Sequence, residues 1–120
     1  MNLPINEIFN SVQGEGSYTG TPSVFVRLQA CFVGCQFCDT KHTWTKDNNK
    51  IIPFHDMLGK QKDSDEWSDT PIATLVAFLV GQPERHIVIT GGEPCMYDLI
   101  ELTTGLINLD KTIQIETSGT

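Results

Sequence analysis

The sequence predicts an α/β fold built on a parallel β-sheet. Three apolar runs have the pattern of buried strands, and the segments that precede the second and third of them have the spacing of helices. The order is strand, long connection with a helix, strand, helix, strand, which is typical of parallel strands joined by right-handed crossovers. We expect the 120 residues to form one domain.

The first core strand is predicted at residues 23–29. Successive side chains of a strand point to opposite faces, so Val24, Val26 and Leu28 share one face, and Phe25, Arg27 and Gln29 share the other. An arginine in so apolar a strand needs an anionic partner or a route to water. Before this strand we expect a short strand at residues 5–10 and a glycine-containing loop at residues 13–16.

The connection that follows contains an irregular insertion at about residues 45–70, with polar runs and a short helix at residues 54–58. A clearer helix then begins near Thr70, which we expect to be the N-cap, with Pro71 at the first helical position. Gly81 and Pro83 end this helix. Its apolar stripe consists of Ile72, Leu75, Val76, Leu79 and Val80.

Residues 87–90 form a short apolar run suited to a buried parallel strand. A turn at residues 91–94 leads to a second helix at residues 96–107, and residues 112–116 give the third core strand. Ligands gather at the carboxyl ends of the strands in such sheets. Those ends carry the cysteines described next, residues 91–94 and residues 116–119, so we expect a site where these three loops meet.

Cys31, Cys35 and Cys38 form a C-x3-C-x2-C motif. Three thiolates can bind three irons of a 4Fe-4S cluster and leave the fourth iron free for a small molecule. Alternatively, His42 completes a Cys3His set for a structural zinc ion, and a third reading is that the cysteines are reactive or simply buried. We expect Cys95 to be a small buried residue.

Eight basic residues against fifteen acidic ones give a formal charge of −7. This balance argues against broad binding to nucleic acid or to anionic membranes, because both need a basic field. No apolar stretch is long enough to span a membrane, and the first residues do not have the pattern of a secretory signal. Together with the clustered cysteines, this leads us to expect a reducing, cytoplasmic location.

The cysteine motif, with Phe37 before its last cysteine, and the strand ending in Gly91-Gly92-Glu93-Pro94 resemble the radical S-adenosylmethionine superfamily. Within it, the chain is similar to the 7-carboxy-7-deazaguanine synthase family. The similarity lies at residues 5–7, 13–16, 26–29, 38–44, 89–95 and 114–120. The resemblance implies a parallel-sheet partial (β/α) barrel of which residues 1–120 are the N-terminal half, truncated at Thr120.

The resemblance also implies an enzyme of the lyase type in queuosine (7-deazapurine) biosynthesis. This activity converts 6-carboxy-5,6,7,8-tetrahydropterin to 7-carboxy-7-deazaguanine with loss of ammonia, using a 4Fe-4S cluster, S-adenosyl-L-methionine and Mg²⁺. The expected partners are the pterin, a flavodoxin or ferredoxin as electron donor, and a second copy in a homodimer when the chain is full length. Another small radical enzyme, such as an activase that generates glycyl radicals, and a zinc-stabilised binding domain remain alternatives. A truncated chain can be an inactive fragment.

The residues that match the family's motifs are expected to have the family's roles, and none is assigned as a general acid or base. Cys31, Cys35 and Cys38 would bind the cluster, and Thr40 would bind Mg²⁺. The expected contacts of S-adenosylmethionine are Phe37, Cys38, Asp39, Gly92, Glu93 and Glu116. The expected contacts of the pterin are Val12, Gln13, Gly14, Arg27 and Thr90.

Several of these residues have simpler alternatives. Arg27 suits a carboxylate because a guanidinium binds it through two hydrogen bonds, but it could instead pair with Glu15 or Glu116 for structural reasons. Thr40 could cap a turn, and Glu116 could be a solvated strand end.

Overall fold

The computed structural model describes residues 2–14, 16–29, 51–59, 66–91, 94 and 97–116. In this part of the chain, five strands form one sheet in the order β3-β1-β2-β4-β5. The strands are β1 (Asn2–Val12), β2 (Pro22–Leu28), β3 (Ser68–Pro71), β4 (His86–Gly91) and β5 (Thr112–Ile115). The helices are α1 (Phe54–Leu58), α2 (Ile72–Val80) and α3 (Ile100–Ile107), with a short 3-10 helix, η1 (Gly16–Tyr18), between β1 and β2.

The predicted parallel core is confirmed, because β4 pairs in parallel with both β2 and β5. The sheet has two further strands, since β1 runs antiparallel to β2 and to β3. It is therefore a mixed sheet of five strands, whereas the sequence predicts a parallel sheet of three core strands preceded by a short strand at residues 5–10. Within the described residues the sheet is not closed into a barrel, because β3 and β5 are the two ends of the strand order.

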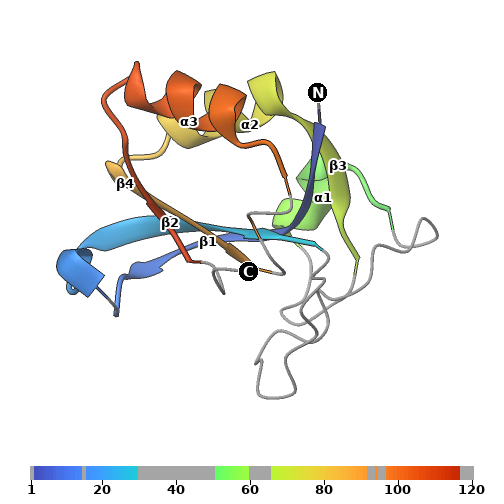
Figure 1. Cartoon of the computed structure of the whole chain (residues 1–120). Helices are drawn as coiled ribbons and strands as arrows, with labels where there is room; N and C mark the ends of the chain where they lie inside the picture. Colours follow the sequence, from blue (N-terminus) through green and yellow to red (C-terminus); the bar gives the residue numbers. More distant parts are fainter. Residues whose placement is uncertain are drawn as a thin grey trace.

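Helices α2 and α3 lie side by side over one face of the sheet, and α1 lies at the β3 end (Figure 1). The core fills the space between these helices and the sheet. Alternate residues of the strands enter it, as the sequence predicts for Val24, Val26 and Leu28. The fully buried side chains that meet there from strands and helices are Leu3, Ile5, Val24, Val26, Leu28, Ile87, Ile89, Leu75, Leu79, Leu102 and Leu106.

The start of α2 differs from the prediction. Thr70 lies in β3 opposite Leu3, and its hydroxyl lies 2.8 Å from that of Ser68, so it does not cap the helix. Pro71 keeps an extended backbone (φ −59°, ψ 139°) and occupies the N-cap position, so α2 begins at Ile72. Pairing with β1 holds these residues in a strand that their own sequence does not favour.

Two other boundaries differ. β1 is longer than the predicted strand at residues 5–10, because it pairs with β2 and β3 in turn. α3 begins at Ile100 rather than at Met96, and Oδ1 of Asp98 accepts a hydrogen bond from the Ile100 amide at 3.0 Å. The short helix predicted at residues 54–58 is confirmed as α1. Within the region predicted as an irregular insertion, the described residues contain α1 and most of β3.

None of the helices in the described part of the chain is long and apolar enough to cross a membrane.

Candidate functional site

The predicted site residues fall into two groups. Eight of them lie outside the described residues: Cys31, Cys35, Phe37, Cys38, Asp39, Thr40, Gly92 and Glu93. The structure describes the other six, which are Val12, Gln13, Gly14, Arg27, Thr90 and Glu116. The geometry of the site is therefore built here from the second group and from the residues that contact it.

Three of these six residues lie next to one another at the carboxyl ends of the parallel strands. Arg27 on β2 is in register with Thr90 on β4. The backbone amide of Glu116, the residue after β5, donates a 2.9 Å hydrogen bond to the carbonyl of Ile89. The sheet thus carries polar groups across three neighbouring strands, at the edge where the sequence predicts a site.

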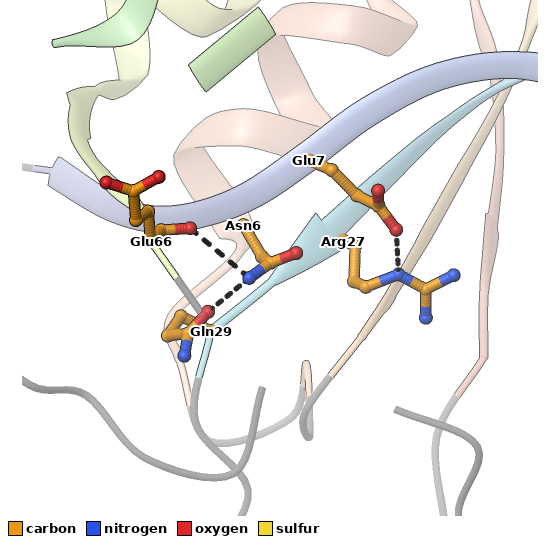
Figure 2. Close-up of polar contacts among 5 residues, drawn as sticks. All are labelled: Asn6, Glu7, Arg27, Gln29 and Glu66. Carbon is orange, nitrogen blue, oxygen red and sulfur yellow. Dashed lines mark hydrogen bonds and ion pairs between the residues drawn. The ribbon is translucent and has the colours of Figure 1, made fainter. Parts of the chain in front are cut away.

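The anionic partner that Arg27 requires is Glu7 on β1. Nε of Arg27 donates a 2.7 Å hydrogen bond to Oε1 of Glu7, and only 16% and 13% of the two side chains are exposed (Figure 2). The partners suggested by the sequence, Glu15 and Glu116, are not those that the structure gives: Glu116 bonds elsewhere, and Glu15 lies outside the described residues. The Arg27 guanidinium also lies over the Phe9 ring, 5.7 Å from its centroid.

A β-bulge in β1 explains why Glu7 reaches Arg27. Ile5 pairs with Leu28 and Glu7 pairs with Arg27, so Asn6 is an extra residue on the β1 side. Without the bulge, Ile5 and Glu7 would share a face. The extra residue leaves Ile5 in the core and turns Glu7 to the opposite face, beside Arg27.

Gly91 permits the close packing of β2 against β4 at this point. Its φ is +101°, and a Cβ atom there would lie 2.3 Å from the Leu28 amide nitrogen and 2.5 Å from Cγ of Arg27. Only glycine fits such a backbone conformation and such a short approach. The stem of Arg27 therefore occupies the space that a side chain at position 91 would take.

The connection between β1 and β2 reaches the site by folding across the face of the sheet opposite α2 and α3. Tyr18 stacks on His86 of β4 at 4.1 Å between ring centroids, and an added Cβ on Gly16 would lie 3.3 Å from Nε2 of Gln114 on β5. At the end of this path, Nε2 of the buried Gln13 donates a 3.3 Å hydrogen bond to Oε2 of Glu116. Gln13 and Glu116, far apart in sequence, thus meet at the predicted site.

Val12 and Gly14 are placed differently from Gln13. Val12 pairs with Pro22 at the start of β2, whereas Arg27 lies near the other end of that strand. Val12 is 59% exposed, and Gly14 is also exposed. The structure therefore places Arg27, Thr90 and Glu116 on neighbouring strands and joins Gln13 to Glu116, whereas Val12 lies at the other end of β2 from Arg27.

A buried network that sequence reasoning missed fixes the end of β2. Nδ2 of Asn6 donates a 2.7 Å hydrogen bond to Oε1 of Gln29, and the Tyr97 hydroxyl donates one of 2.9 Å to the Gln29 carbonyl. The backbone amide of Gln29 donates a 2.9 Å hydrogen bond to the backbone carbonyl of Pro4. Burial raises the pKa of Tyr97 above its usual value of 10.0. Gln29 is the last described residue before Cys31, so this network fixes the backbone two residues ahead of the cysteine motif in the sequence.

Among the described residues, no group of three or more histidine, cysteine, aspartate or glutamate side chains could hold a metal ion. The predicted metal ligands all lie in the remaining part of the chain. The described site is instead suited to a small polar ligand. The terminal nitrogens of Arg27 offer donors to an anion, and Thr90 and the Gln13–Glu116 pair add groups of both hydrogen-bonding types.

No family model matches the chain, but curated proteins and solved structures do. A 7-carboxy-7-deazaguanine synthase of Escherichia coli strain K12 is 49% identical over 122 residues, covering 100% of this chain and 55% of the relative. One of Halobacterium salinarum is 38% identical over 119 residues, covering 98% of this chain and 40% of the relative. The crystal structure of QueE from Escherichia coli superposes with a TM-score of 0.95 at 49% identity, covering 100% of this chain and 54% of that one. The chain thus spans about half the length of the Escherichia coli relatives.

Proposed function

Because this chain belongs to the 7-carboxy-7-deazaguanine synthase family and matches the N-terminal half of its members, we propose that it forms the part of such a synthase that holds the iron–sulfur cluster and binds a carboxylated pterin. The reaction is the conversion of 6-carboxy-5,6,7,8-tetrahydropterin to 7-carboxy-7-deazaguanine with loss of ammonia. This is a carbon–nitrogen lyase reaction in queuosine biosynthesis.

The observation that carries the proposal is the placement of Arg27. Its side chain is mostly buried at the carboxyl edge of the parallel strands, in register with Thr90, and of its nitrogens only Nε is bonded to a described residue. A guanidinium on a mostly buried side chain, with unbonded terminal N–H donors, suits a carboxylate, because charge-assisted bonds are stronger where water is largely excluded. The pterin would thus be oriented by its carboxylate at Arg27, with Thr90 and Gln13 near its ring.

The chemistry of the donor set fits a 4Fe-4S cluster. Three cysteine thiolates at C-x3-C-x2-C spacing match a cluster that keeps one iron free of protein ligands, so Cys31, Cys35 and Cys38 would hold it. When bound, the cluster and S-adenosylmethionine supply the radical that starts the rearrangement. Further contacts to S-adenosylmethionine would come from Phe37, Cys38, Asp39, Gly92, Glu93 and Glu116, and an oxygen of Thr40 would bind Mg²⁺.

The finer architecture and the partners are part of the same proposal. The parallel order β2-β4-β5, with α2 and α3 on one face, supports a partial barrel of the radical S-adenosylmethionine type. We expect a flavodoxin or ferredoxin to supply the electron, a homodimer in the full-length enzyme, and a cytoplasmic location in which the three thiols stay reduced.

The test is reductive cleavage of S-adenosylmethionine by the anaerobically reconstituted protein. With dithionite as reductant, we expect chromatography to detect 5′-deoxyadenosine from the wild type and none from the Cys38→Ser variant. Added 6-carboxytetrahydropterin should yield 7-carboxy-7-deazaguanine, identified by its mass. An iron-loaded protein that forms no 5′-deoxyadenosine would contradict the proposal. A colourless protein that retains zinc would instead favour a zinc-stabilised binding domain.

A further inference from the structure

The pairing of Glu7 with Arg27 uses one specific edge of the guanidinium. Arg27 has five N–H donors, and Glu7 accepts only the one on Nε, at 2.7 Å. Within the described part of the chain, the two terminal nitrogens have no hydrogen-bond partner, and Figure 2 shows them directed away from Glu7. The edge formed by these two nitrogens is the one that binds both oxygens of a carboxylate at once.

Three neighbours restrict the orientation of this guanidinium. The first is Glu7, which the bulge at Asn6 turns toward Arg27. The second is the Phe9 ring below the guanidinium, itself stacked on Phe25 with 5.1 Å between centroids and 4° between planes. The third is Gly91, whose missing side chain leaves room for the Arg27 stem. A long side chain with so few alternatives loses little freedom when a ligand binds.

We infer that Glu7 is a positioning residue, which holds Nε of Arg27 so that the two terminal nitrogens receive a ligand carboxylate end-on. The inference rests on the proposed function, in which Arg27 binds the carboxylate of the pterin. Glu7 itself does not touch the ligand. It also balances the charge of a mostly buried Arg27 when no ligand is bound, and an unpaired buried charge would be costly.

The inference predicts how the site selects its ligand. A lysine at position 27 would place one compact ammonium where Arg27 presents a planar group. That ammonium could not bond Glu7 along one edge and both carboxylate oxygens along another. The guanidinium of Arg27, held in this orientation, should therefore bind a pterin that carries a planar carboxylate more tightly than the same pterin without a carboxylate.

The experiment measures the dissociation constants of 6-carboxypterin and of unsubstituted pterin by their fluorescence. The constant for unsubstituted pterin divided by the constant for 6-carboxypterin gives a ratio that reports the contribution of the carboxylate alone. We expect wild type to prefer 6-carboxypterin, and Arg27→Ala to lose this preference.

Glu7→Ala should reduce the ratio by roughly tenfold or more, the effect of losing one charge-assisted hydrogen bond. Glu7→Gln keeps an oxygen that accepts from Nε and should retain the ratio within about threefold. Glu101→Gln, the same charge change on the exposed surface of α3, is the matched control.

The outcomes separate this inference from the proposed function. If wild type shows no preference, or if Arg27→Ala retains it, the carboxylate role of Arg27 fails, and the role of Glu7 fails with it. If Arg27→Ala loses the preference while Glu7→Ala keeps it, the proposed function stands and the positioning role is wrong. If the ratio for Glu7→Gln is as low as that for Glu7→Ala, the preference depends on the charge of Glu7 rather than on its bond to Nε, and the positioning role is wrong.

A measurement on the unmodified protein guards against a Glu7→Ala variant that does not fold. In nitrogen-15 spectra with the arginine side chains labelled, added 6-carboxypterin should shift the terminal-nitrogen signals of Arg27. The Nε–H signal should remain in place and stay protected from exchange with water. Loss of that protection on ligand binding would mean that the ligand displaces Glu7, and would overturn the inference.

Discussion

The Asn6 side chain donates a 2.7 Å hydrogen bond to Oε1 of Gln29, and both residues are completely buried. Asn6 is the bulge residue of β1, and its side chain turns toward the end of β2. One local irregularity therefore has two effects. It directs Glu7 to Arg27, and it fixes Gln29, which lies two residues before Cys31 in the sequence.

Replacing Asn6 should weaken the whole domain. Asn6→Ala removes the bond to Gln29 in a buried setting, so we expect the free energy of unfolding to fall by about 1–3 kcal/mol. Urea denaturation followed by circular dichroism measures this change. Asn108→Ala, at the exposed end of α3, is the control and should change the free energy by less than about 0.5 kcal/mol. Equal effects of the two substitutions would contradict the role given to the network.

Tyr97 should make the stability of the fold depend on pH in the alkaline range. Burial raises the pKa of Tyr97 in the folded state above 10.0, so the unfolded chain ionises first as the pH rises. The contribution of Tyr97 is fully present below pH 10.0 and is lost as the pH rises through the folded-state pKa. Tyr97→Phe should reduce the alkaline fall in stability and should lower stability at neutral pH by about 1 kcal/mol, because the bond to Gln29 is lost. An unchanged alkaline profile in this variant would assign the effect to other groups.

Gly91 should tolerate no side chain. Gly91→Ala would force a Cβ to 2.3 Å from the Leu28 nitrogen at a φ of +101°, so we expect a loss of about 2–5 kcal/mol in the free energy of unfolding. Thermal and urea unfolding both report this loss. Gly59→Ala provides the comparison, since its φ is −104° and nothing lies within 4 Å of an added Cβ. Comparable stability of the two variants would show that β2 and β4 can separate at this point at little cost.

The cysteine assignment makes a prediction about iron content. Cys35→Ala removes one of three expected cluster ligands, so iron and sulfide after anaerobic reconstitution should fall to background. Cys95→Ala should bind as much iron as wild type, because Cys95 is not expected to be a ligand. Both contents are measured by colorimetric assay against protein concentration. Full iron retention by Cys35→Ala would disprove the assignment.

Much of the core could be predicted from the sequence because strand patterns depend on local spacing. The alternation in β2 correctly predicts which side chains face the helices and that Arg27 faces the other way. The apolar run at residues 87–90 correctly predicts a buried strand with parallel partners. These features need only the period of the backbone and the cost of exposing apolar groups.

The features that the sequence did not reveal depend on contacts between distant residues. β3 has the sequence Ser-Asp-Thr-Pro and is a strand only because β1 pairs with it. The alternation shows that Arg27 needs a carboxylate, but only the bulge identifies Glu7 as that carboxylate. Likewise, no local pattern indicates that the connection after β1 crosses the sheet and brings Gln13 to Glu116.

In the proposed function, this chain carries a 4Fe-4S cluster with one iron open to S-adenosylmethionine. The most direct test is electron paramagnetic resonance of the anaerobically reconstituted and reduced protein, recorded with and without S-adenosylmethionine. We expect the signal of a reduced 4Fe-4S cluster that changes when S-adenosylmethionine is added, because the cofactor would bind the open iron. A cluster signal that is indifferent to S-adenosylmethionine, or a colourless protein containing zinc, would contradict it.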